Sequence, residues 1–182
     1  MPKTYTAAGT VAAGDVYTAA AHNIIATDVN NFIVPPLCRV RRATNQSIPN
    51  VTDTFVSWTL EDIDTDGMFT ATSDTITIQT TGVYLVAASV YFAANATGQR
   101  IINMMKSPTT ASDLAAAFAQ SWFPVASATN PSTLSASGLV SCVAGDTIKI
   151  VVYQTSGGPL NIADTGFTSA TQCSIAWVGR TP

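Results

Sequence analysis

The stretch Thr81-Gly-Val-Tyr-Leu-Val-Ala-Ala-Ser-Val-Tyr-Phe92 decides the fold. In an extended chain, successive side chains point to opposite faces. One face of this stretch carries Tyr84, Val86, Ala88, Val90 and Phe92, and the other carries Val83, Leu85, Ala87, Ser89 and Tyr91. Because both faces are largely apolar, the pattern predicts a strand covered on both sides. We therefore expect a two-layer protein in which partner subunits are candidates for the second cover.

Composition indicates a chain that hides part of its surface in an assembly. Its 182 residues suit one sizeable domain with a short appendage. Only 10% of the residues are charged, against about 25% in an ordinary soluble domain. The eight basic residues and the net charge of −3 exclude a basic patch for nucleic acid. No apolar run approaches the ~20 residues of a membrane helix, and we predict neither membrane insertion nor a signal peptide.

Residues 1–36 differ from the rest and predict an N-terminal arm. Thr18 and Thr27 are suitable helix N-caps, and Pro35-Pro36 ends whatever precedes it. We expect one or two short helical turns on a mostly extended arm. Such an arm buries too little to fold alone. It must therefore lie on the domain, on a neighbouring subunit or in a socket of a larger assembly.

Residues 37–182 predict a single all-β domain. The expected strands are 37–42, 54–60, 69–79, 81–92, 100–106, 114–123, 133–143, 147–154 and 171–178. The alanine run within 114–123 also suits a helix, and we favour a strand because its neighbours are strands. Many short strands with Gly, Pro, Asn and Ser loops indicate a sandwich or barrel. About ten strands in one domain favour a jelly roll over an immunoglobulin-like sandwich.

Three segments resemble the C1q/TNF-like jelly-roll family across residues 37–180. Gly82-Val-Tyr-Leu-Val is similar to the family's Gly-x-Tyr-x-Phe strand. Ser135-Ala-Ser-Gly-Leu-Val-Ser-Cys-Val-Ala-Gly-Asp-Thr-Ile resembles its Ser-hydrophobic-x-Leu-x-x-Gly-Asp-x-Val segment. Phe167 and Ser174-Ile-Ala-Trp-Val-Gly resemble the closing strand, with an insertion between them. The resemblance implies a compact homotrimer. The residues expected to pack the core and the trimer are Tyr84, Val86, Val90, Phe92, Ile148, Ile150, Val152 and Trp177.

A narrower resemblance concerns virus particles. The segment Ile48-Pro-Asn-Val-Thr-Asp-Thr-Phe-Val-Ser-Trp, with Asp64-Thr-Asp-Gly-Met, resembles C1q-like domains of tailed-bacteriophage structural proteins. The arm, with Ala13-Gly-Asp-Val-Tyr-Thr-Ala-Ala and then Asp28-Val-Asn-Asn-Phe-Ile, is similar to the N-terminal segments of many phage tail and minor virion proteins. These resemblances imply a protein made in the bacterial cytoplasm and displayed on the exterior of the virion, as a head decoration or a short tail or fibre-tip component. The arm residues expected to anchor it to capsid or tail proteins are Tyr17, Val29, Phe32 and Ile33.

One motif resembles a metal site. Asp62, Asp64 and Asp66 precede Gly67, as at the start of a calcium loop. The twelfth position is Ser73 instead of the usual Glu. Two interpretations stay open, a calcium site and an acidic turn whose carboxylates bond local backbone amides. No other cofactor is expected.

Residues 44–99 contain six acids and no Lys or Arg. Their field favours a cation or a basic partner surface, such as Arg39, Arg41 or Arg42 of a neighbouring subunit. Arg100 has two interpretations, a partner of Asp146 in the trimer core and a surface residue.

No catalytic constellation is recognisable, because the single histidine, His22, lies in the arm. We therefore expect no enzyme. The cysteines Cys38, Cys142 and Cys173 lack metal-ligand spacing and predict buried thiols, with a bridge between the last two left open.

The aromatic residues leave an alternative function open. They are Trp58, Trp122, Trp177, Tyr84, Tyr91 and Phe92. They suit core and interface packing, and they also suit a stacking platform of a lectin-like adhesin that binds a host receptor or glycan.

Overall fold

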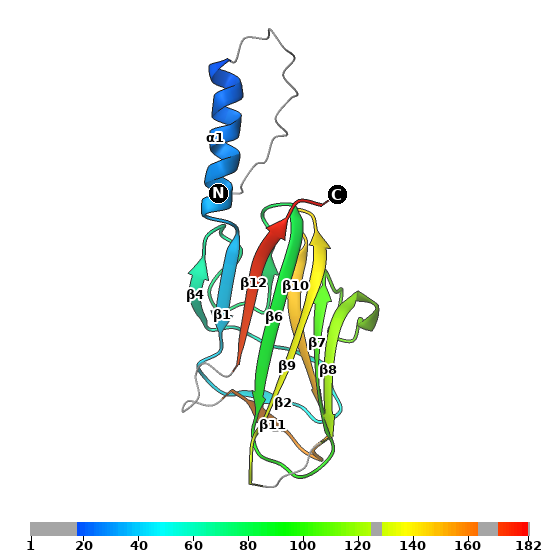
Figure 1. The fold of residues 1–182 in the computed structure, drawn as a ribbon. Helices are drawn as coiled ribbons and strands as arrows, with labels where there is room; N and C mark the ends of the chain where they lie inside the picture. Colours follow the sequence, from blue (N-terminus) through cyan, green and yellow to red (C-terminus); the bar gives the residue numbers. More distant parts are fainter. Residues whose placement is uncertain (1–17, 125–128, 164–170, 182) are drawn as a thin grey trace.

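The computed structural model describes residues 18–124, 129–163 and 171–181. One helix, α1 (Ala19–Ile33), precedes two antiparallel sheets packed face to face (Figure 1). The seven-stranded sheet, called sheet A, contains β1 (Leu37–Arg41), β2 (Gln46–Ile48), β4 (Leu60–Asp64), β6 (Gly82–Phe92), β9 (Ser132–Cys142), β11 (Leu160–Ile162) and β12 (Gln172–Gly179). The five-stranded sheet, called sheet B, contains β3 (Thr54–Phe55), β5 (Ile76–Thr77), β7 (Gln99–Lys106), β8 (Ala117–Pro124) and β10 (Thr147–Gln154). These sheets confirm the all-β jelly-roll prediction.

Strand β6 lies in the middle of sheet A. It pairs with β9 along its whole length on one side and with β12 on the other, and β1 and β4 continue the sheet beyond β12. In sheet B, β7 lies between β8 and β10. Most neighbouring strands are distant in sequence, so the chain passes repeatedly between the two sheets.

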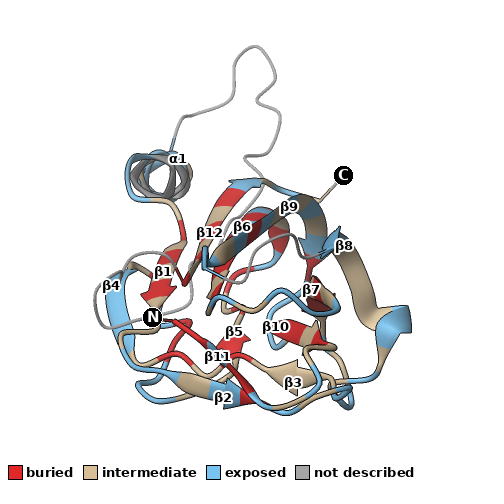
Figure 2. Cartoon of the chain, turned by 90° about the horizontal axis from the view of Figure 1, so that it is seen from below, coloured by how far each residue is buried: buried red, intermediate tan, exposed pale blue. Residues whose placement is uncertain are grey.

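The core fills the space between the two sheets (Figure 2). Trp58, Tyr84 and Phe92 are fully buried there. All eight residues predicted for core and trimer packing lie in this core: Tyr84, Val86, Val90, Phe92, Ile148, Ile150, Val152 and Trp177. They therefore pack the inside of one chain and leave the outside of the sandwich to other residues.

No described element of the chain covers the second face of β6. Its burial alternates along the strand, and the side chain of Leu85 is 43% exposed. The described residues thus cover one face of the strand, and a second cover by partner subunits stays a prediction. Any second cover must come from outside the described residues.

Several predicted elements differ from the structure. Helix α1 has 15 residues, where short turns on an extended arm were expected. It begins after Thr18, whose hydroxyl accepts a hydrogen bond from the Ala21 amide at 3.2 Å, as predicted for an N-cap. Segment 114–123 divides into a short 3-10 helix (Leu114–Ala116) followed by β8. Leu60 does not join Val56 and Trp58 in the core, because the chain crosses from sheet B to sheet A between β3 and β4.

Gly82 is required where β6 passes Trp177 of β12. A Cβ atom at position 82 would lie 2.0 Å from Trp177 Nε1 and 2.6 Å from the carbonyl oxygen of Gly179. The indole of Trp177 is held nearby, with Nε1 3.4 Å from the carbonyl oxygen of Thr81. Any side chain at position 82 must therefore displace the indole or the backbone of β12.

We predict that Gly82→Ala destabilises the fold by about 1–3 kcal/mol, the usual cost of overpacking. Chemical denaturation of the purified protein measures this change. Gly158→Ala is the matched control, because a Cβ at position 158 meets nothing within 4 Å. Equal stability of the two variants would contradict the role assigned to Gly82.

Candidate functional site

The outward face of sheet A is the candidate site. Strand pairing places its side chains in three cross-strand rows over β1, β12, β6 and β9. The first row contains Leu37, Ala176, Leu85 and Leu139. The second row contains Arg39, Ser174, Ala87 and Ser137, and the third contains Arg41, Gln172, Ser89 and Ser135. We call these twelve residues the outward face.

The outward face is apolar in its first row. Leu85 is 43% exposed and its cross-strand neighbour Leu139 is 64% exposed. Val178, near the same end of β12, is also exposed. The adjoining exposed side chains form an apolar patch, and contiguous apolar patches are typical of surfaces that contact another protein.

The second and third rows form a shallow hollow. It has a volume of about 320 Å³ and is lined by Ala87, Ser89, Ser135, Ser137, Gln172 and Ser174, with Ala88 and Ala136. Because these side chains are short, another surface can approach the backbone of β6 closely. The hydroxyl groups offer hydrogen bonds and carry no charge.

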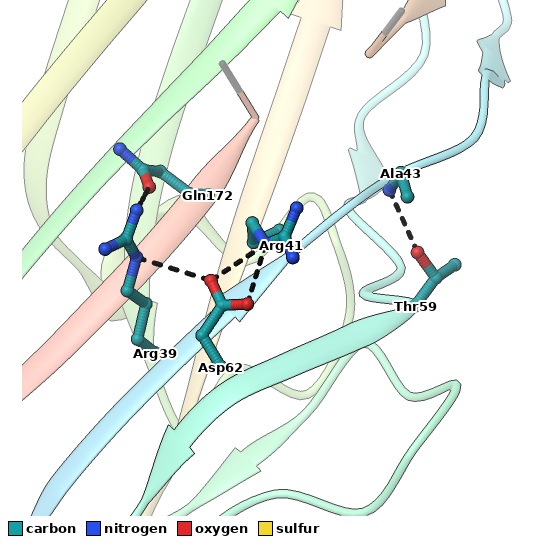
Figure 3. A network of polar contacts seen from close by, with 6 residues as sticks. All are labelled: Arg39, Arg41, Ala43, Thr59, Asp62 and Gln172. Carbon is teal, nitrogen blue, oxygen red and sulfur yellow. Dashed lines mark hydrogen bonds and ion pairs between the residues drawn. The ribbon is translucent and has the colours of Figure 1, made fainter. Parts of the chain in front are cut away.

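Two arginines and one aspartate form a polar cluster at the β1 edge of this face (Figure 3). The Nε atom of Arg41 lies 2.8 Å from Asp62, and the Nε atom of Arg39 lies 3.5 Å from it. The Nη2 atom of Arg39 also donates to the Gln172 amide oxygen at 2.6 Å. A bulge in the pairing of β1 with β4 lies beside Asp62. The cluster links β4, β1 and β12 and holds one unbalanced positive charge.

This cluster corrects one prediction. We expected the acids of residues 44–99 to meet arginines of a neighbouring subunit, and Asp62 instead pairs with Arg39 and Arg41 of its own chain. Asp74 likewise pairs with Lys149 at 3.1 Å. Burial tends to raise the pKa of Asp74, but hydrogen bonds from Thr75 and Lys149 outweigh it and lower the pKa. Ion pairs this exposed contribute at most about 1 kcal/mol each.

The three aspartates of the calcium-like motif have separate partners. Asp62 faces the arginines, while Asp64 accepts hydrogen bonds from the amides of Asp66, Gly67 and Phe69 at 2.8–3.1 Å. Asp66 is buried and accepts a hydrogen bond from the Thr80 hydroxyl at 2.8 Å. Among the described residues, no group of three His, Cys, Asp or Glu side chains is placed to hold a metal. The geometry matches the acidic-turn interpretation, which we favour over calcium binding.

The arm residues stand apart from the outward face. Helix α1 projects beyond the end of the sandwich (Figure 1), with Val29 and Ile33 exposed. Tyr17 lies outside the described residues, and the side chain of Phe32 is not described. His22 also lies on α1. No helix in the described segments is long and apolar enough to cross a membrane.

Most of the aromatic residues pack inside the sandwich. Trp58, Tyr84, Phe92 and Trp177 are buried, whereas Trp122 is 54% exposed. The indole Nε1 of Trp122 donates to the Gln99 amide oxygen at 2.7 Å. This pair lies where β7 begins and β8 ends, at the end of the sandwich away from α1 (Figure 1).

Arg100 is buried near this same end of sheet B. Its guanidinium donates to the carbonyl oxygens of Asn95, Thr97 and Gln99 at 2.9–3.3 Å. Burial lowers its pKa. Asp146 is bonded instead to Lys106, at the other end of β7. Neither interpretation of Arg100 holds, because the residue supports a loop inside the chain.

The three cysteines are free and buried. Cys142 is paired with Gly82 and Cys173 with Ala88, at well-separated positions along β6, so the two cannot form a bridge. Burial raises the pKa of Cys142 to about 11 and that of Cys173 to about 12. Burial also raises the pKa of Cys38, with a further contribution from Asp64. The thiols are therefore structural, as predicted.

The two sheets and their strand order define a jelly-roll domain of the TNF/C1q type. The structure of murine APRIL at pH 5.0 matches with a TM-score of 0.58 and 12% identity, over 79% of this chain and 98% of that chain. The globular domain of zebrafish complement 1qA matches with a TM-score of 0.51 and 12% identity, over 80% and 99%. Eiger TNF from S. frugiperda matches with a TM-score of 0.54 and 13% identity, over 81% and 96%. No family model and no curated sequence matches the chain. At these identities the likeness shows the fold alone.

We predict that a calcium chelator leaves the melting temperature of the protein unchanged, because the three aspartates are engaged elsewhere. Asp64→Asn should lower the melting temperature with or without chelator, since it weakens the acceptor of three backbone amides. Differential scanning calorimetry measures both effects. A fall of several degrees in chelator, reversed by added calcium, would instead establish the calcium site.

Proposed function

We propose that the chain is a non-enzymatic structural protein of a tailed-bacteriophage virion. Three copies form a trimer through the outward face of sheet A, and the trimer is displayed on the exterior of the particle. The N-terminal arm attaches it to capsid or tail proteins. The phage assignment is supported by the sequence resemblances of segments 48–58 and 64–68 and of the arm.

The exposed first row of the outward face is the observation that carries this proposal. Leu85 and Leu139 face each other across the paired strands β6 and β9 of sheet A, where a monomeric sandwich gains nothing from an exposed leucine. Contact with another copy would remove both side chains from water, at roughly 25 cal/mol for each Å² of apolar surface buried. The hollow beside them allows the two backbones to come close.

The low charge of the chain supports the same arrangement. Charged groups are costly to bury in an interface, and the second and third rows carry only Arg39 and Arg41 among neutral side chains. Both arginines are already neutralised in part by Asp62. A partner that covers this face therefore meets mostly neutral side chains and one net positive charge at the β1 edge.

We predict that light scattering of the purified chain gives three copies per particle at micromolar concentration, and that Leu85→Asp gives monomers. The new carboxylate would be costly to bury between subunits. Leu114→Asp is the matched control, because Leu114 is comparably exposed but lies on the 3-10 helix before β8. A wild-type monomer, or a trimer that survives Leu85→Asp, would contradict the proposed interface.

Cryo-electron microscopy of the phage that encodes the chain tests the virion assignment. We predict trimeric density of the jelly roll on the outside of the particle, with the α1 end directed toward the capsid or tail. The same maps distinguish a head decoration from a tail or fibre-tip component. Purified virions from which the chain is absent would refute the assignment.

A glycan-binding module is the second candidate function, and the exposure of Trp122 favours it. Its indole is fixed by Gln99 at the end of the sandwich away from α1. An exposed, oriented tryptophan suits stacking against a sugar ring. Glycan binding by the trimer that is lost in Trp122→Ala would assign this role.

A further inference from the structure

Helix α1 carries an exposed apolar stripe. Ile25, Val29 and Ile33 are 41%, 50% and 70% exposed. Their spacing of four residues places them on one side of the helix, one turn apart. Ala20, also exposed, lies about opposite Val29 on the helical circumference. The stripe itself is left exposed by the described part of the sandwich.

This helix needs a partner to be stable. It projects away from both sheets (Figure 1). Isolated helices shorter than about 12–15 residues are marginal in water even with a favourable sequence. With 15 residues that include the weak helix formers Thr27, Val29, Asn30 and Asn31, α1 lies near that limit. Asp28 is the single acidic residue of α1, and the helix contains no Lys or Arg. Packing of the stripe is the main stabilising term available.

The segment that follows α1, residues 35–37, is hydrogen-bonded to the sandwich. The carbonyl oxygen of Pro35 accepts a hydrogen bond from the Thr65 hydroxyl at 2.7 Å, and that of Pro36 accepts one from the Trp177 amide at 3.0 Å. The Leu37 amide donates to Thr65 Oγ1 at 2.8 Å. These bonds attach the start of β1 to β12 on one side and to Thr65, the residue after β4, on the other. The helix therefore leaves the sandwich at a defined place.

Along the chain, the stripe ends at Ile33, shortly before Leu37 begins the apolar row of the outward face. Leu37, the first residue of β1, belongs to the row of Leu85 and Leu139 and follows Ile33 by four residues. The view along the strands places α1 on the outward side of sheet A (Figure 2). A copy that covers the outward face therefore brings its own α1 close to that of its neighbour.

We propose that the α1 helices of the three copies pack into one parallel three-helix bundle through Ile25, Val29 and Ile33. This inference rests on the trimer of the proposed function. The partner that covers the stripe is another copy of the chain, because the C-terminal end of each helix is held at the surface that the copies share. Joining the helices to an assembled body raises their effective concentration, so that two turns of apolar contact suffice. The three arms then attach to the particle together, as one bundle with threefold symmetry.

Disulfide trapping tests the bundle in the full chain. Val29→Cys places a thiol in the stripe, and Ala20→Cys, the matched control, places one on the opposite side of the helix. The native cysteines are buried, so they do not compete. Light scattering and thermal melting first establish the oligomeric state and folding of each variant. After mild oxidation, denaturing gels without reductant should show covalent dimers for Val29→Cys and little for Ala20→Cys.

The outcomes separate the bundle from the trimer. Trimeric variants that fail to cross-link at position 29, or that cross-link equally at both positions, would overturn the bundle and leave the proposed function intact. Monomeric variants together with a monomeric parent would overturn both. As a second measurement, Ile25→Asn with Val29→Asn should lower the melting temperature of the full-length trimer, because the bundle loses its apolar contacts. An unchanged melting temperature would contradict the bundle.

Discussion

The alternation of side chains along β6 is the constraint on which the rest of the structure depends. One set of side chains packs against sheet B and the other points away from it, so the fold itself covers only half of a strand that is apolar on both faces. The close passage of Gly82 past Trp177 brings β12 beside β6, and full pairing with β9 completes the middle of sheet A. The inward side chains form the core of the sandwich, and the outward side chains leave an apolar surface that a partner could cover.

The long strands could be predicted from sequence because each satisfies one strong local pattern. The segments that became β6, β9, β10 and β12 alternate over at least eight residues, and turn residues bound several of them. The short strands β2, β4 and β11 were missed, because strands of three to five residues owe their pairing to distant partners and carry little pattern. The length of α1 was underestimated because its asparagines and β-branched residues have weak helix propensity.

The candidate site could be predicted only in part. The apolar second face of β6 is visible in the sequence, but its exposure depends on which elements the chain lays over it. The polar cluster gave no signal, since Arg39 and Asp62 are far apart in sequence and a bulge between β1 and β4 lies beside them. The calcium-like motif shows the same limit. Its alternate carboxylates fit a cation loop by spacing, yet tertiary contacts gave Asp62, Asp64 and Asp66 different partners.

The three enclosed thiols have a consequence for the surroundings that the protein tolerates. Thiolate is the form that oxidises and exchanges, and burial holds Cys142 and Cys173 in the neutral form far above neutral pH. The jelly roll contains no disulfide bond among its described residues, and its three thiols are too deeply buried to form one with another molecule. It keeps the same covalent structure in a reducing cell interior and in an oxygenated medium outside, and no redox step separates its synthesis from its use.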